Sequence, residues 1–175
     1  HGEMMGSHGF MGKAVMYEDA IRVPLLMRIP ESIRHMSHKE VNIPVSTVDI
    51  VPTLLDLMGK SSEKDGIQGE SLLPLTEGIK PRNRYVVSVL NPSKYAEDWP
   101  KKFEELTEEE TYKYYKASFR TVISSDGWKL TLSDVDKNQL FNLNEDKYEC
   151  NNLYYLNKYN EIIYRLKEQI CSWQQ

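Results

Sequence analysis

The chain has 175 residues, a length that suits one domain or one domain together with part of another. It carries 22 Lys and Arg residues against 26 Asp and Glu residues, and this formal net charge of −4, with no basic stripe, argues against nucleic-acid binding. No apolar run approaches the ~18 residues that a membrane-spanning helix needs, so we expect no membrane segment, and the sequence assigns no cellular location.

The first thirteen residues concentrate glycine and polar side chains in one stretch. This stretch holds four glycines, the two histidines His1 and His8, one carboxylate and Lys13. Glycine permits positive φ, imidazole and carboxylate are metal ligands, and an ammonium group suits an anion. The pattern predicts an irregular loop that wraps a small ligand. A mobile terminus and a cloning remnant are the competing interpretations.

Two elements are predicted directly after this loop. Residues 16–22 indicate a short helix with acidic residues in its early turns. Val23 to Pro30 form a continuous apolar run bounded by prolines, which is typical of a buried strand in a parallel sheet.

Residues 45–59 give the clearest helix signal in the chain. Ser46 or Thr47 suits the N-cap, Asp49 lies near the reciprocal capping position, and Gly59 ends the apolar periodicity. We interpret Asp49 as a capping residue rather than a catalytic one.

The remainder predicts a small antiparallel sheet covered by one helix. Asp126-Gly127 is a favoured hairpin turn, and the apolar spacing over 159–173 indicates an amphipathic helix. Strands are expected at 85–90, 119–124, 128–133 and 139–143, and a helical insertion near 91–117. The insertion holds aromatic residues that could stack on sugar rings, although packing is the favoured interpretation: Tyr95, Trp99, Tyr112, Tyr114 and Tyr115.

Several motifs occur in an order that resembles the sulfatase family, the formylglycine-dependent branch of the alkaline phosphatase superfamily. His1-Gly2-Glu3, with His8-Gly9 and Lys13, is similar to the family's Asp-His-Gly-Glu … His-Gly … Lys segment. Similar segments follow at residues 17–25, 46–55, 69–75, 125–130 and 140–146, so the resemblance covers residues 1 to about 152.

The resemblance implies an α/β fold with two parts. Residues 1–82 would be the C-terminal portion of the main alkaline-phosphatase-like α/β/α domain. Residues 83–175 would be an antiparallel β-sheet subdomain packed by the C-terminal helix, with the insertion near 91–117.

The resemblance also implies the site and its chemistry. His1 matches a metal-ligand histidine, Lys13 the lysine that contacts the sulfate group, and His8 a residue that lines the same site. The expected metal is Ca2+, and the expected substrate is a sulfated small molecule or glycan. The formylglycine nucleophile comes from a Cys-x-Pro-Ser-Arg motif, which this sequence lacks. Cys150 and Cys171 are interpreted as unreactive thiols, and a disulfide between them cannot be deduced.

Two consequences are expected, and two alternatives remain open. The chain would be a C-terminal sulfatase fragment that is inactive alone. Its apolar strand would have an uncovered edge, which favours self-association. The alternatives are a phosphonate monoester or phosphodiester hydrolase of the same superfamily, and a noncatalytic binding or assembly module.

Overall fold

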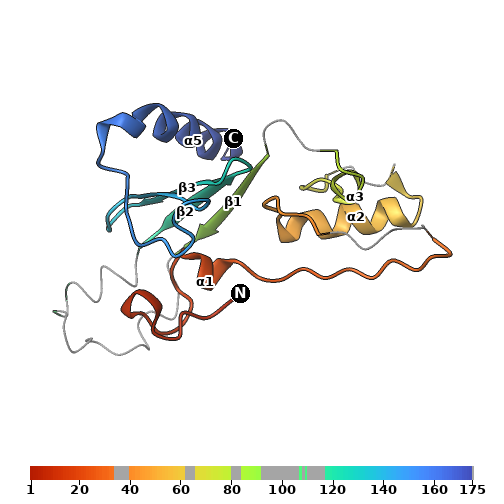
Figure 1. Ribbon diagram of the computed structural model, residues 1–175, viewed down its shortest axis with the longest axis horizontal. Helices are drawn as coiled ribbons and strands as arrows, with labels where there is room; N and C mark the ends of the chain where they lie inside the picture. The colour runs from red at the N-terminus through yellow and green to blue at the C-terminus, as the bar shows by residue number, and fades with distance from the viewer. Residues whose placement is uncertain are drawn as a thin grey trace. The chain divides into compact units, whose positions relative to one another are not determined.

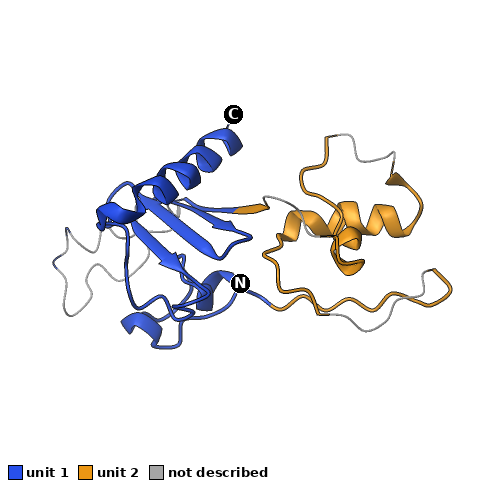
Figure 2. Ribbon diagram, turned by 45° about the horizontal axis from the view of Figure 1, so that its top comes forward, with its two compact units in different colours: residues 1–23, 87–175 blue, residues 24–86 orange. Residues whose placement is uncertain are grey.

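The computed structural model describes residues 1–33, 40–61, 66–79, 84–91, 107, 109 and 117–174. The chain forms two compact units, one of residues 1–23 with 87–175 and one of residues 24–86 (Figure 2). The expected division into 1–82 and 83–175 concerns the parent fold and stays a prediction.

A four-stranded sheet with the order β1-β2-β3-β4 dominates the larger unit (Figure 1). The β2–β3 and β3–β4 pairs are antiparallel, which confirms the small antiparallel sheet expected from the alternating pattern. The bounds of the strands are β1 Tyr85–Leu90, β2 Phe119–Ser124, β3 Trp128–Ser133 and β4 Gln139–Asn142.

The turn between β2 and β3 lies where the sequence predicts it but is one residue longer than the two-residue type. Ile123 pairs with Lys129, so residues 125–127 form the connection. Gly127 adopts φ 87° and donates its N–H to the Ser124 carbonyl at 3.0 Å. A three-residue hairpin loop needs this left-handed position, and glycine adopts it without steric cost.

The C-terminal helix α5, Asn160–Trp173, follows the short 3-10 turn Asn157–Tyr159 in the sequence and packs on this sheet. Its buried residues are Ile163, Leu166 and Ile170, the periodic apolar positions of the sequence. The sheet side of the core contains the fully buried Val122, Leu130 and Leu140. The predicted amphipathic helix and its packing on the antiparallel sheet are therefore confirmed.

The N-terminal residues belong to the same unit as the sheet. They contain a single 3-10 turn, Ser7–Gly9, and the short helix α1, Glu18–Ile21. Met4, Val15 and Ala20 form a small buried cluster that joins the start of the loop to α1. The predicted helix at 16–22 is confirmed, although it is shorter.

The second unit is built around α2, Ile50–Leu57, which follows the 3-10 turn Thr47–Asp49. A one-turn helix, α3 Leu73–Thr76, buries Leu73 and Leu75. Gly59 adopts φ 71° directly after α2, as a helix stop requires.

The predicted buried strand at Val23 to Pro30 is wrong for this chain. These residues form no strand in the structure, and the Leu26 side chain is 90% exposed. A parallel strand is stabilised by hydrogen bonds to its neighbours, and the four-stranded sheet of the described residues does not include this segment. The expected uncovered strand edge is therefore absent, and most apolar side chains of this run are themselves exposed.

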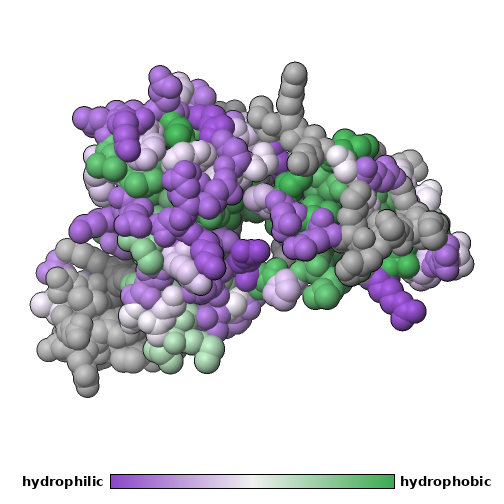
Figure 3. Space-filling view, viewed as in Figure 1, coloured by the Kyte–Doolittle hydropathy of each residue, from purple (hydrophilic) through white to green (hydrophobic). Residues whose placement is uncertain are grey.

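Further apolar side chains are exposed on the second unit, and Figure 3 shows the hydrophobic surface there in green. They include Val51, Leu54 and Met58 on and after α2. The predicted insertion near 91–117, with its aromatic residues, lies outside the described residues apart from 91, 107, 109 and 117. Among the described helices, none has the length and apolar character to cross a membrane.

Candidate functional site

The glycine-rich loop is closed by its own backbone. The Met4 N–H donates to the Gly12 carbonyl at 2.8 Å, and the Gly6 N–H donates to the Phe10 carbonyl at 2.8 Å. Left-handed φ values recur along it, at Met5, Gly6, His8, Gly9 and Gly12. The glycines therefore reverse the chain repeatedly within a few residues, as the composition indicated.

This folding brings two of the three predicted site residues together. The Lys13 Nζ lies 2.7 Å from His1 Nε2, although twelve positions separate the residues. His1 Nδ1 lies 2.8 Å from the Gly2 carbonyl oxygen, which can only accept a hydrogen bond. In a neutral imidazole this assigns the proton to Nδ1 and leaves the Nε2 lone pair facing the Lys13 ammonium group.

His8, the third predicted residue, packs elsewhere in the loop. Its ring stacks on Tyr17 with a centroid separation of 3.9 Å and an angle of 9° between the planes. The Tyr17 hydroxyl accepts a hydrogen bond from Gln139 Nε2 at 3.0 Å. Burial raises the pKa of the Tyr17 hydroxyl, although the Gln139 hydrogen bond opposes the shift. His8 is thus held through Tyr17 rather than through the His1–Lys13 pair.

The described residues contain no group of three or more His, Cys, Asp or Glu side chains that could hold a metal ion. His1 presents one nitrogen donor on an exposed edge. Calcium requires six to eight mostly oxygen ligands, so one imidazole fits only as a single member of a larger, carboxylate-rich set.

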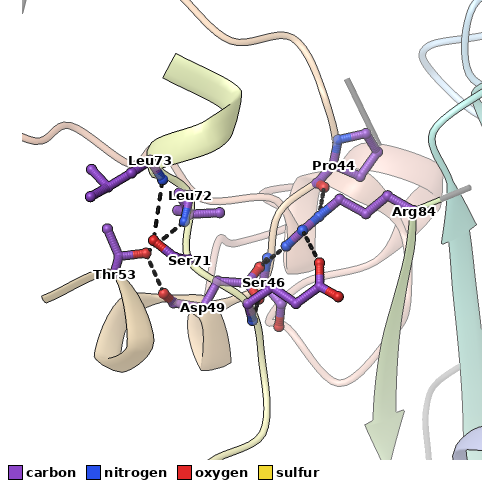
Figure 4. Close-up of polar contacts among 9 residues, drawn as sticks. Pro44, Ser46, Asp49, Thr53, Ser71, Leu72, Leu73 and Arg84 are labelled. Atoms are coloured by element: carbon purple, nitrogen blue, oxygen red, sulfur yellow. Dashed lines mark hydrogen bonds and ion pairs between the residues drawn. The ribbon is translucent and has the colours of Figure 1, made fainter. Parts of the chain in front are cut away.

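A buried polar network that the sequence reading missed lies in the second unit (Figure 4). Arg84 is 8% exposed, and its guanidinium group pairs with the buried Asp49 carboxylate and, at 3.2 Å, with Glu70. It also donates to the Pro44 carbonyl at 3.1 Å. No local pattern around Arg84 marked it for burial, because its partner lies 35 positions away.

Asp49 acts as the predicted cap and as the centre of this network. Its carboxylate accepts the Ser46 N–H at 2.8 Å, which confirms the capping role, and the Glu70 N–H at 2.9 Å. Thr53 extends the network, since its hydroxyl donates to the Asp49 carbonyl at 2.6 Å and accepts the Leu72 N–H at 2.9 Å. The network therefore fastens the segment 69–72 to the start of α2.

Gly69 shows how tightly this segment approaches the helix. It adopts φ 95°, and a Cβ atom there would lie 2.4 Å from the Val48 carbonyl oxygen. The arrangement joins two backbone segments through buried polar contacts. We interpret it as structural.

Both cysteines are exposed, free thiols. Cys171 lies in α5 but not among its buried residues, which are Ile163, Leu166 and Ile170. The Cys150 N–H donates to Asp146 at 3.0 Å, so its backbone completes a turn.

The chain is similar in sequence to known sulfatases. Residues 6–175 match the profile of the family described as N-sulphoglucosamine sulphohydrolase, C-terminal. An N-acetylglucosamine-6-O-sulfatase of Bacteroides thetaiotaomicron is 30% identical over 178 residues, which cover 95% of this chain and 28% of that protein. The chain thus spans less than a third of that relative.

Solved structures agree in fold. One is an enzyme in complex with its substrate D-glucosamine-2-N,6-O-disulfate, with a TM-score of 0.64, 25% identity, and coverage of 99% of this chain and 32% of that one. Another is a phosphonate monoester hydrolase of Agrobacterium radiobacter, with a TM-score of 0.67, 21% identity, and coverage of 97% of this chain and 32% of that one. At this identity the second likeness shows the fold alone.

Proposed function

Because this chain belongs to the sulfatases, in the family of N-sulphoglucosamine sulphohydrolase C-terminal regions, we propose that it is the C-terminal part of a sulfuric-ester hydrolase. Within that enzyme the loop 1–13 would line the active site. The proposal is supported most directly by the contact between His1 and Lys13, the two matched motif residues with assigned roles.

Lys13 would bind the sulfate group of the substrate. Its ammonium group is a compact positive charge with three donors, and its partner His1 Nε2 occupies only one of them. Charge that develops on the oxygens of a sulfate ester during hydrolysis is stabilised by donors held in place beforehand. The closed loop supplies this preorganisation, because backbone hydrogen bonds hold the segment between the two residues.

His1 would be one ligand of a divalent cation, for which we propose Ca2+. Its Nδ1 bond to the Gly2 carbonyl orients the ring, and Nε2 would bind the cation in place of the Lys13 ammonium group that it contacts in this structure. A bound cation would supply further positive charge for the sulfate oxygens. Since the described residues offer no set of three ligands, the carboxylates of the site would come from elsewhere in the enzyme.

The nucleophile would also come from elsewhere, because neither Cys150 nor Cys171 lies in a Cys-x-Pro-Ser-Arg motif. We therefore propose that these 175 residues alone do not hydrolyse sulfate esters, and that formylglycine is a cofactor of the complete enzyme. His8 is proposed as a lining residue only. Its stacking on Tyr17 suits a role in shaping the loop.

The substrate class that we propose is a sulfated amino sugar or a related small sulfate ester. The relatives' names mention N-acetylglucosamine and glucosamine disulfate. A phosphonate monoester or phosphodiester would present a similar tetrahedral anion to Lys13, so that activity is the alternative. A noncatalytic binding module is the third candidate.

The test uses the complete reading frame that contains these codons, expressed together with a formylglycine-generating system. We expect hydrolysis of D-glucosamine-2-N,6-O-disulfate, and a kcat about 10²- to 10³-fold lower for Lys13→Ala, the range seen when one preorganised donor is removed. The 175-residue chain should give no turnover. Turnover by that chain, or a preference for phosphonate esters, would contradict the proposal, and an inactive complete protein would favour the binding module.

A further inference from the structure

A buried charge cluster lies beneath the candidate loop. Lys129, the second residue of β3, is 0% exposed, and its Nζ lies 2.9 Å from Glu18 Oε1 and 2.7 Å from Glu149 Oε1. The Glu18 and Glu149 side chains are 16% and 2% exposed. One buried cation is therefore shared by two carboxylates, one from α1 and one from the loop after β4.

Stability alone is a weak explanation for this cluster. Taking an ammonium group and two carboxylates out of water costs several kcal/mol for each ion, and a well-packed apolar residue often serves a core as well or better. An ion cluster differs from apolar packing in one respect, since it requires particular atoms to meet. Here it specifies where α1 lies on the sheet.

Glu149 fixes α1 by a second bond. Its Oε2 accepts the backbone N–H of Glu18 at 2.6 Å, at the first residue of the helix. The backbone of Glu149 itself adopts φ 56°, an uncommon conformation for a residue with a side chain. The carboxylate thus binds both the charged end of Lys129 and the start of α1.

The end of α1 in turn holds the first residues of the chain. The Gly2 N–H donates to the Ala20 carbonyl at 2.7 Å. The approach is so close that a Cβ at Gly2 would lie 2.0 Å from the Asp19 carbonyl oxygen. His1 precedes this contact directly, and Lys13 binds His1. A continuous series of bonded contacts therefore runs from β3 through α1 to the His1–Lys13 pair.

Tyr17, the residue directly before α1, contacts the part of the loop that contains His8. Tyr17 stacks on His8 and accepts a hydrogen bond from Gln139 on β4. Displacement of α1 from the sheet would accordingly move His8 as well as His1.

We propose that Lys129, together with Glu18 and Glu149, is a positioning group that sets the His1–Lys13 pair and His8 relative to the sheet. In the enzyme its consequence for sulfate binding rests on the proposed function. The geometric part concerns this chain alone and is measurable without any activity.

The experiment is histidine and amide NMR on the 175-residue chain, comparing the unchanged protein with Lys129→Met. In the unchanged chain we expect ring protons of His8 shifted upfield by the stacked Tyr17, and a His1 ring with its proton on Nδ1. In Lys129→Met we expect loss of the His8 shift and a mixed His1 tautomer, while amides of β2 and β3 keep their dispersion.

A matched control removes an ion pair of the same unit that has no contact with the loop. Arg165→Gln breaks the pair between Arg165 and Asp126, at 2.8 Å, and should leave both histidine signals unchanged.

Because Lys129→Met could unfold the sheet, Glu18→Gln is the second variant. It keeps the side-chain volume and the backbone bond to Glu149, and should weaken both histidine signatures partially.

Two results separate this proposal from the proposed function. Unchanged histidine signals in Glu18→Gln, or in a folded Lys129→Met, would overturn the positioning role. Hydrolysis of D-glucosamine-2-N,6-O-disulfate by the complete enzyme reports on the site itself. If the unchanged chain shows the expected histidine signatures but the complete enzyme does not hydrolyse this ester, the proposed function fails while the positioning role stands.

Discussion

Asp49 provides the sharpest energetic prediction of the structure. Replacing it with Ala removes acceptors for two backbone N–H groups, those of Ser46 and Glu70, and the charge partner of Arg84. Arg84 would then stay buried without this carboxylate, although Glu70 and the Pro44 carbonyl remain among its partners.

The cost follows from these contacts. Loss of a helix cap typically costs ~1 kcal/mol, and breaking a buried ion pair from one side costs about 3–5 kcal/mol. Glu70 still faces Arg84 and is 78% exposed, so water and this carboxylate relieve part of the second penalty. We therefore expect local destabilisation of about 3–4 kcal/mol for Asp49→Ala.

Native-state hydrogen exchange measures this locally, which suits a chain with two compact units. The Glu70 and Leu72 amides bond to Asp49 and Thr53, so they report the opening of the network. Since about 1.4 kcal/mol is a tenfold change in an equilibrium constant, both amides should exchange about 10²- to 10³-fold faster. Glu70→Gln, which changes an exposed partner, should alter exchange less than about fivefold.

The double variant Asp49→Ala/Arg84→Met provides the decisive comparison. Without a buried unpaired charge, it should be more stable than the sum of the two single changes predicts, by about 2 kcal/mol. The assignment of Asp49 and Arg84 as a buried ion pair would be refuted if the two single destabilisations summed to that of the double variant. A destabilisation below about 1 kcal/mol for Asp49→Ala would refute it as well.

Three further changes test other parts of the chain. Gly2→Ala should break the bond to Ala20, because its Cβ would meet a carbonyl at 2.0 Å, and NMR should show loss of the Lys13–His1 contact with an intact sheet. Leu26→Glu, at a 90% exposed apolar position, should reduce self-association measured by sedimentation velocity, and an unchanged association constant would exclude this face. Burial raises the pKa of Glu149 above its ordinary value of 4.5, although Lys129 opposes the shift. The Glu149 carboxyl therefore ionises at a lower pH in the unfolded chain than in the folded one. The free energy of unfolding of the unchanged protein should then fall, relative to that of Glu149→Gln, as the pH rises through and above 4.5. Parallel curves of unfolding free energy against pH would contradict this.

The local elements were readable because their determinants are close in sequence. The hairpin around Asp126-Gly127 combines two alternating runs with a turn residue, and α5 repeats its apolar residues every three or four positions. The capping role of Asp49 depends on a residue three positions away. In each case a few neighbouring residues fix the backbone, so the pattern and the structure agree.

The run from Val23 to Pro30 illustrates where such reasoning fails. Its composition fits a buried strand, but a strand exists only where a neighbour satisfies its backbone groups. Apolar composition therefore identified a segment suited to burial, and the structure determined that this chain leaves it exposed.

The sequence by itself determined the small antiparallel sheet, its covering helix and the residue types of the candidate site. Only the tertiary structure decided which charges meet. Lys129 and Glu18 are 111 positions apart, and Arg84 and Asp49 are 35 apart. Side chains at such separations approach one another only after backbone packing has placed their elements, and no periodicity in the sequence records that geometry.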